Sequence, residues 1–215
     1  MKSAMIPAAP GAAVTRPLAS RTTLLLGAGA LLLSACSSMP ATDAAGAASA
    51  SSSAGSRAIA TTSALSQASA NLASASGSLV SGSLLLRPMA DGVHLTGEIG
   101  GLAANSTHAI HIHETGDCSA ADASSAGGHF NPTGAPHGQV GTATHHAGDM
   151  NNIVANSDGV AAVNVHASGV VLGGGAANDA IGRAVVVHAQ PDDYTSQPSG
   201  NAGARVACGV IAAGG

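Results

Sequence analysis

Short apolar or alternating segments, separated by glycine and Asx residues, follow one another between residues 78 and 211. A strand with one buried face alternates apolar and polar side chains over a few residues. Segments of this kind are residues 78–86, 93–99, 107–114, 160–165, 169–172, 183–189 and 206–211. No segment has a convincing helical period, so the pattern favours antiparallel β-structure.

The composition of the core supports the same fold class. Aromatic residues make up only 1% of the chain, as Phe130 and Tyr194. A core built from Val, Ile, Leu and Ala suits strands better than a helical bundle. Residues 115–154 and 190–204 lack strand character, and such long loops are usually functional or disordered. We predict an all-β Greek-key β-sandwich, or flattened eight-stranded barrel, with two long functional loops.

The N-terminal segment has the layout of an export signal. Basic residues precede an apolar run at residues 24–33, and Leu33-Ser34-Ala35-Cys36 follows it. This run is far shorter than the roughly 20 residues that span a bilayer. The ending resembles a bacterial lipobox, in which the cysteine becomes the lipidated first residue. An ordinary secretory signal that contains a cysteine is the alternative, and Met5 is an alternative start.

The lipobox interpretation implies three regions and a location. Residues 1–35 would be the signal peptide, and Cys36 would anchor the protein to the bacterial cell envelope. Ser37 favours the outer membrane, facing the periplasm, by resemblance to other bacterial lipoproteins. The Ala/Ser-rich residues 36–74 would form a flexible tether, with a helical stalk as the alternative. The folded domain would then comprise residues 75–215.

Removal of the signal peptide changes the charge and the cysteine inventory. Four arginines then face all eleven acidic residues, a formal charge of −7, so no basic patch remains to bind nucleic acid. With Cys36 lipidated, Cys118 and Cys208 are the remaining cysteines. Export to an oxidising compartment makes a disulfide between them plausible.

Histidines are the main candidates for function. In His111-Ile112-His113 the two imidazoles would project from the same face of a strand, because residues i and i+2 share a face. This motif alone is weak, since surface histidines occur in pairs by chance. Further candidates are His129 in Gly-His-Phe-Asn-Pro, His137 in Pro-His-Gly, His146 and Asp149 in His-Ala-Gly-Asp, and His188 in Val-Val-His.

Six histidines and one aspartate form a donor set typical of transition metals. Imidazole suits copper and zinc, and one carboxylate among imidazoles is typical of zinc. Calcium and magnesium sites are instead rich in oxygen ligands. A purely structural role for all of these histidines is hard to sustain.

These motifs closely resemble those of the copper/zinc superoxide dismutase family. A further motif of the same family is Gly-Asn-Ala-Gly-Ala-Arg-Val-Ala-Cys-Gly-Val-Ile at residues 200–211. The resemblance covers most of residues 77–213. It implies a copper set and a zinc set that share one bridging histidine. The copper ligands would be His111, His113, His129 and His188. The zinc ligands would be His129, His137, His146 and Asp149.

The resemblance also assigns residues around the metals. Asp192 matches the carboxylate that links a copper-binding to a zinc-binding histidine, and Arg205 matches the cation that guides the substrate. His146 is favoured over its neighbour His145 as the ligand, although a one-residue slip would exchange them. His108 would make a structural hydrogen bond under the site. No motif includes His94 or His166, so we expect both to lie on the solvated surface.

The implied reaction is dismutation of superoxide by one-electron cycling of copper, with His129 as both ligand and proton relay. Zinc is redox-inert and would tune the basicity of the bridging His129. The expected partners are superoxide and, through lipidated Cys36, a membrane. Both a monomer and a homodimer stay open. The rival hypothesis is a non-catalytic copper/zinc-binding lipoprotein that buffers or carries metal.

Overall fold

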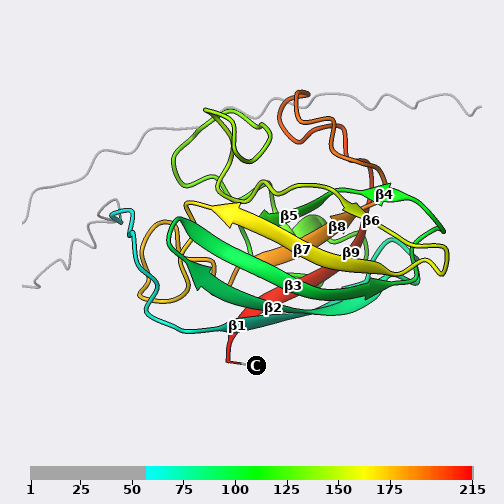
Figure 1. The fold of residues 1–215 in the computed structure, drawn as a ribbon, viewed down its shortest axis with the longest axis horizontal. Coiled ribbons are helices and arrows are strands. Elements are labelled where there is room, and N and C mark those ends of the chain that lie inside the picture. The colour runs from blue at the N-terminus through cyan, green and yellow to red at the C-terminus, as the bar shows by residue number, and fades with distance from the viewer. Residues whose placement is uncertain (1–56, 215) are drawn as a thin grey trace, which may run out of the picture. The chain divides into compact units, whose positions relative to one another are not determined.

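Nine strands and one turn of 3-10 helix make up the regular structure of residues 57–214, the part of the chain that the computed structural model describes (Figure 1). The strands are β1 (Ala68–Ser74), β2 (Ser81–Met89), β3 (Gly92–Gly100), β4 (Thr107–His108), β5 (Ile110–His113), β6 (Ile153–Val154), β7 (Ala161–Ser168), β8 (Ala184–His188) and β9 (Arg205–Ala213). The helical turn is η1 (Ser124–Ala126).

The strands form a nearly closed barrel. Seven of them follow the order β5-β8-β9-β1-β2-β3-β7, and β4 pairs with β6 in a two-stranded ladder. All pairs between these strands are antiparallel. Because β4 leads into β5 and β6 leads into β7, this ladder connects the two edges of the larger sheet. The prediction of an all-β flattened barrel is confirmed.

The interior of the barrel is lined by aliphatic side chains. On β7 every second residue is buried and the residues between are exposed or half-buried, as expected for a strand between core and solvent. The largest side chains of the core include Leu84, Leu86, Leu95 and Ile110, all at most 2% exposed. Phe130 adds an aromatic side chain to this core.

The predicted boundary of the folded domain is wrong by several residues. Residues 68–74 belong to β1, which pairs with β2 on one side and β9 on the other, although this segment was expected to be tether. Its inward side chains are Ala68, Ala70 and Leu72. Small residues fit a strand placed between two neighbours, but they give only a weak periodic signal.

Two other predicted strands differ from the structure. Residues 169–172 form no strand, and only Val171 makes an isolated bridge, to Asp179. Residues 107–114 are divided into β4 and β5 at Ala109, whose N–H donates to the carbonyl of Gln190 instead of a strand neighbour. This bond ties the strand to the second long loop.

The two long loops are present as predicted, between β5 and β6 and between β8 and β9. Figure 1 shows both on the same side of the barrel, in yellow-green and in orange. The predicted signal peptide, Cys36 and residues 36–56 of the predicted tether lie outside the described residues. Within residues 57–214, no helix has the length and apolar character needed to cross a membrane.

Candidate metal centre

Strands β5 and β8 position the first group of histidines. Ile110 and Ile112 of β5 are fully buried in the core, so His111 and His113 project from the opposite face of the strand. That face is covered by the first long loop, where His129 forms an isolated bridge with His113. His188 is the last residue of β8, the strand that pairs with β5.

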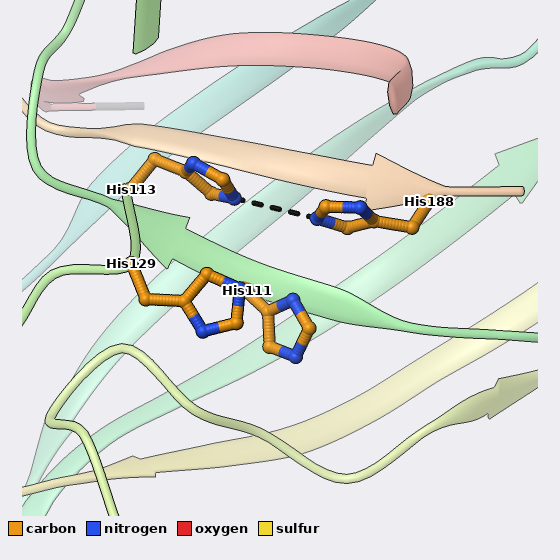
Figure 2. A group of neighbouring side chains, drawn as sticks. All are labelled: His111, His113, His129 and His188. Atoms are coloured by element: carbon orange, nitrogen blue, oxygen red, sulfur yellow. Dashed lines mark hydrogen bonds between the residues drawn. The ribbon is translucent and has the colours of Figure 1, made fainter. Parts of the chain in front are cut away.

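These side chains converge in a buried group, which we call the copper group (His111, His113, His129 and His188). One nitrogen from each lies within 4.8 Å of the others. The Nε2 atoms of His113 and His188 are 3.3 Å apart (Figure 2). His111 Nδ1 and His129 Nε2 are buried and have no hydrogen-bond partner among the described residues.

A second buried group, which we call the zinc group, comprises His129, His137, His146 and Asp149. His129 Nδ1 lies 2.8 Å from Asp149 Oδ1 and 3.4 Å from His146 Nδ1. His146 Nδ1 is 3.3 Å from Asp149 Oδ1. His129 therefore presents Nδ1 to the zinc group and leaves Nε2 for the copper group.

The donor atoms fit a bound cation better than they fit one another. His137 Nδ1 lies 3.0 Å from Asp149 Oδ2, yet it makes no hydrogen bond and is buried. In a tetrahedral site with zinc–nitrogen bonds of about 2.0–2.1 Å, neighbouring donors are about 3.3–3.4 Å apart. Two spacings in the zinc group, 3.3 and 3.4 Å, match this value, and the other two, 2.8 and 3.0 Å, are shorter. A metal would satisfy the orphaned nitrogens.

Hydrogen bonds from the opposite ring nitrogens fix the tautomers. His113 Nδ1 donates to the carbonyl of Gly127 at 3.0 Å, and His188 Nδ1 lies 3.4 Å from that of Gly203. A carbonyl oxygen only accepts, so Nδ1 of each ring bears the proton and Nε2 keeps its lone pair. Both Nε2 atoms belong to the copper group.

The Asp192 carboxylate links the two groups through one histidine of each. His111 Nε2 donates to one of its carboxylate oxygens and His137 Nε2 to the other, each at 2.9 Å. The remaining nitrogen of each ring, Nδ1, then points into its metal group. Such partners orient the ligand and increase its basicity.

Burial and neighbouring charges set the protonation of the site. Burial lowers the pKa of His113 to about 2, of His188 to about 3 and of His129 to about 4. Burial also lowers the pKa of His137, but the nearby Asp149 and Asp192 carboxylates outweigh it and raise the pKa to about 9. Most of these imidazoles are thus neutral, as metal binding requires.

The two carboxylates of the site are ionised for a different reason. Burial raises the pKa of Asp149, but its close contacts with His129, His137 and His146 hold that pKa well below its usual range. For Asp192, hydrogen bonds from His111 and His137 overcome burial in the same way and lower the pKa. Negative charge is therefore available to balance a divalent cation.

A cavity of about 540 Å³ leads to the copper group. Its lining includes three histidines of the copper group, His113, His129 and His188, together with His146 of the zinc group and Arg205. The Arg205 guanidinium donates to the carbonyl of Ala123 at 2.7 Å and to that of Gly127 at 2.6 Å. The first long loop thus holds the only arginine in this lining in place.

A disulfide between Cys118 and Cys208 confirms the expected pairing. Cys208 lies on β9, three residues after Arg205, and Cys118 lies in the loop that provides the carbonyls for Arg205. The bond therefore connects the loop over the metal groups to the strand of the arginine.

The other histidines lie outside both groups. His108 Nδ1 donates to the carbonyl of His188 at 2.8 Å, which is the structural hydrogen bond that the resemblance implied. His146, not His145, joins the zinc group, and His145 lies 2.7 Å through Nδ1 from the His146 carbonyl. His94 and His166 are half-buried on neighbouring strands, and His166 lies 3.2 Å from Asp91.

Sequence reasoning missed two amide side chains that hold the site. Asn152 donates to the backbone carbonyl of Asp192 at 2.9 Å and accepts its N–H at 2.8 Å. Gln197 makes the same pair of bonds with the backbone of His137. Neither residue lies in a metal-binding motif, and amides have many surface roles, so the sequence offered no signal for them.

Asp192 provides a testable prediction. We expect Asp192→Asn to weaken the retention of both metals by about 10- to 100-fold, because the amide offers one acceptor oxygen in place of two. Competition with a chelator measures this loss. Asp193→Asn is the matched control, since Asp193 is exposed and, among the described residues, its side chain bonds only to Thr195 and Ser196. Equal metal retention in the two variants would contradict the role of Asp192.

Comparison with known proteins supports the metal chemistry. Residues 80–211 match the family model described as copper/zinc superoxide dismutase. Superoxide dismutase [Cu-Zn] 2 of Aquifex aeolicus is 47% identical over 114 residues, which cover 52% of this chain and 67% of that protein. Superoxide dismutase [Cu-Zn] 1 of the same organism is 45% identical over 123 residues, covering 56% and 73%.

Solved structures agree with the fold. A SOD-like protein from Bacillus subtilis is 33% identical, with a TM-score of 0.60 over 66% of this chain and 96% of that one. A double mutant of a SOD-like protein from the same organism is 35% identical, with a TM-score of 0.61 over 67% and 96%.

Proposed function

Because the chain belongs to the copper/zinc superoxide dismutase family, we propose that it converts superoxide to oxygen and hydrogen peroxide. The copper group would hold copper and the zinc group would hold zinc, so His129 would bind both. The observation that supports this most is the position of His129, whose two nitrogens face different groups. Two superoxide ions and two protons give one oxygen and one hydrogen peroxide.

The metals divide the chemistry between them. Copper supplies a couple that accepts and returns one electron, while zinc is redox-inert and acts as a Lewis acid. The protein contributes the geometry: four buried imidazoles aimed at one point, with three of their tautomers set by hydrogen bonds to Asp192, Gly127 and Gly203.

His129 is suited to handle a proton at Nε2. This nitrogen is buried, has no hydrogen-bond partner in the described part of the chain, and belongs to a residue that lines the cavity. Its Nδ1 is held on the opposite side by Asp149 at 2.8 Å. The ring can thus give or take a proton at Nε2 without losing its position.

Arg205 is suited to bind the anionic substrate. It lines the cavity next to three copper-group histidines, and two carbonyls fix its guanidinium. A fixed guanidinium binds small anions through charge-assisted hydrogen bonds. In the lining of this cavity Glu114 is the only carboxylate, and its Oε1 accepts the N–H of Gly128.

We expect Arg205→Ala to lower kcat/KM for superoxide by about 10- to 100-fold, since a hydrogen bond to a charged group contributes about 1.5–3 kcal/mol. The copper and zinc contents should not change. Superoxide consumption by copper/zinc-loaded protein measures the effect. Arg87→Ala is the control, because Arg87 is exposed on β2. An Arg205 variant as fast as the wild type would overturn this assignment.

A non-catalytic metal buffer or carrier is not favoured. Such a protein needs the ligands, but it needs neither a cavity that reaches the copper group nor a guanidinium fixed beside it. Both features fit a site through which a small anion passes.

The proposed location is the bacterial cell envelope. Residues 1–35 would direct export, and Cys36 would anchor the protein in the outer membrane, facing the periplasm. The Ala/Ser-rich sequence after Cys36 would link the anchor to the folded domain, which includes β1. The disulfide supports an oxidising compartment. Metabolic labelling with a fatty acid, compared with a Cys36→Ala variant, tests the anchor.

A further inference from the structure

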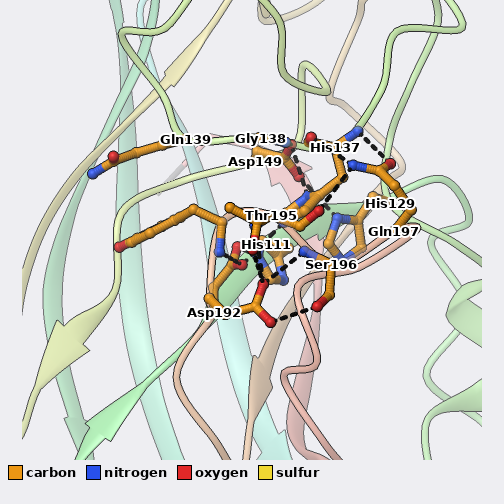
Figure 3. Close-up of polar contacts among 12 residues, drawn as sticks. His111, His129, His137, Gly138, Gln139, Asp149, Asp192, Thr195, Ser196 and Gln197 are labelled. Atoms are coloured by element: carbon orange, nitrogen blue, oxygen red, sulfur yellow. Dashed lines mark hydrogen bonds and ion pairs between the residues drawn. The ribbon is translucent and has the colours of Figure 1, made fainter.

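Gln197 lies in the loop between β8 and β9, and its side chain holds one proposed ligand by the backbone. Among the described residues it makes no hydrogen bond to a donor atom of either metal group. Its Oε1 accepts the N–H of His137 at 2.9 Å, and its Nε2 donates to the His137 carbonyl at 2.9 Å. Figure 3 shows the amide beside His137, at the edge of the zinc group. The side chain thus pairs with His137 as a neighbouring strand would.

The other members of the zinc group are held differently. His129 is anchored next to β5, where the N–H of Phe130 donates to the carbonyl of Ile112 at 2.8 Å. His146 and Asp149 share one turn, in which the N–H of Asp149 donates to the His146 carbonyl at 3.1 Å. These anchors are backbone–backbone hydrogen bonds.

His137 has no such anchor. It lies in an irregular stretch of the first long loop, and among the described residues its backbone N–H and C=O bond only to Gln197. Its ring is held separately by Asp192 at Nε2, at 2.9 Å. The next residue, Gly138, donates its N–H to Asp149 Oδ2 at 3.1 Å, so this contact comes from the zinc group itself. Outside the zinc group, the contacts that direct Nδ1 of His137 are those of Gln197 and Asp192, and both come from the second long loop.

The residues after Gln197 reach the cavity. Pro198 and Ser199 are in its lining. The chain therefore runs from Gln197, bonded to the His137 backbone, to the rim of the cavity within two residues. Gly200 then packs against the Asp192 carboxylate and His137 Nε2, with no space for a Cβ. One short segment thus contacts the zinc group and shapes the opening to the copper group.

We propose that Gln197 is a positioning residue that holds His137 for zinc and fastens the rim of the cavity to the zinc group. This inference rests on the proposed function, because it takes the zinc group as the zinc site. Gln197 would act through the His137 backbone and would touch neither metal nor substrate.

Zinc release from protein loaded with zinc alone tests the proposal. We expect Gln197→Ala to release zinc to a chelator about 10-fold faster than the wild type, the lower end of the effect of residues that orient metal ligands. Gln197→Met, which keeps the length but not the hydrogen bonds, should behave alike. Gln139→Ala is the matched control, since this exposed side chain makes no hydrogen bond among the described residues.

Two further measurements separate positioning from a general structural role. Hydrogen exchange at the His137 amide should be faster in both Gln197 variants, and the thermal midpoint of the metal-free protein should match that of the wild type. The proposal is overturned by wild-type zinc release in either Gln197 variant. It is equally overturned if the metal-free midpoint falls as much as the midpoint of the zinc form.

This experiment uses neither copper nor superoxide, so its result is independent of dismutation. A wild-type protein that binds zinc but leaves superoxide untouched would contradict the proposed function and leave the role of Gln197 standing. If the wild type consumes superoxide but the Gln197 variants release zinc at the wild-type rate, the role of Gln197 is contradicted and the dismutase assignment stands.

Discussion

Replacing His129 with alanine is expected to lower superoxide consumption by more than about 100-fold, beyond the effect of losing a residue that only orients a ligand. His129 is the one residue common to the two metal groups. The substitution removes Nδ1 from the zinc group and Nε2, the proton-handling atom, from the copper group. Activity per bound copper, measured after loading with copper and zinc, is the direct readout.

His145→Ala is the control for this prediction. His145 lies in the same loop and next to a zinc-group residue, but its ring belongs to neither group. It should keep near wild-type activity and zinc content. The comparison also tests the one-residue ambiguity of the motif, because loss of zinc from His145→Ala but not from His146→Ala would reverse the ligand assignment. A His129→Ala variant with wild-type turnover would contradict the shared-ligand account.

The disulfide is expected to have the largest effect on stability. It closes a loop with a sequence separation of 90 residues. Chain-entropy reasoning predicts that Cys118→Ser lowers the free energy of unfolding by about 4–5 kcal/mol, a model-dependent upper value. Urea unfolding of the metal-free protein measures this change. A loss below about 1 kcal/mol would show that the loop is held by other contacts.

Loss of the disulfide should also affect the site before the barrel unfolds. Cys118 and Cys208 pack with Ala123 and Ala126, close to the carbonyls that hold Arg205. Without the covalent link, this part of the loop is held only by noncovalent contacts. We therefore expect Cys118→Ser to release zinc faster than the wild type under conditions where far-UV circular dichroism is unchanged. Unchanged zinc affinity would contradict this coupling.

The candidate ligands could be singled out from the sequence because their motifs are short and local, and the family resemblance divided them between the two metals. His111 and His113 alternate on one strand, and the loop motifs place His129, His137, His146 and Asp149 within 21 consecutive residues. The structure brings these residues together with His188, the end of the neighbouring strand β8. Their metal-binding roles stay predictions that the variants described above test.

Strand β1 was missed because its stability comes from its neighbours. Its sequence, ASANLAS, has one large apolar residue, and Ala and Ser have little strand preference. Pairing with β2 and β9 determines its conformation, and neither partner belongs to the serine-rich segment it was grouped with. Tertiary pairing of this kind has no counterpart in a local pattern.

The amide side chains of Asn152 and Gln197 escaped prediction for a related reason. Each bonds to backbone atoms, 40 residues away for Asn152 and 60 residues away for Gln197. A backbone partner leaves no trace in residue type, so only the three-dimensional structure identifies it. Asp192 was found because its role came from a family motif, not from its own surroundings in the sequence.

The rate of superoxide consumption by protein that contains one copper and one zinc per chain tests the central claim most directly. Stopped-flow measurement should show consumption far above the uncatalysed rate, and protein loaded with zinc alone should stay at that background. If fully loaded protein also leaves superoxide at the background rate, the two adjoining metal groups do not form a dismutase site.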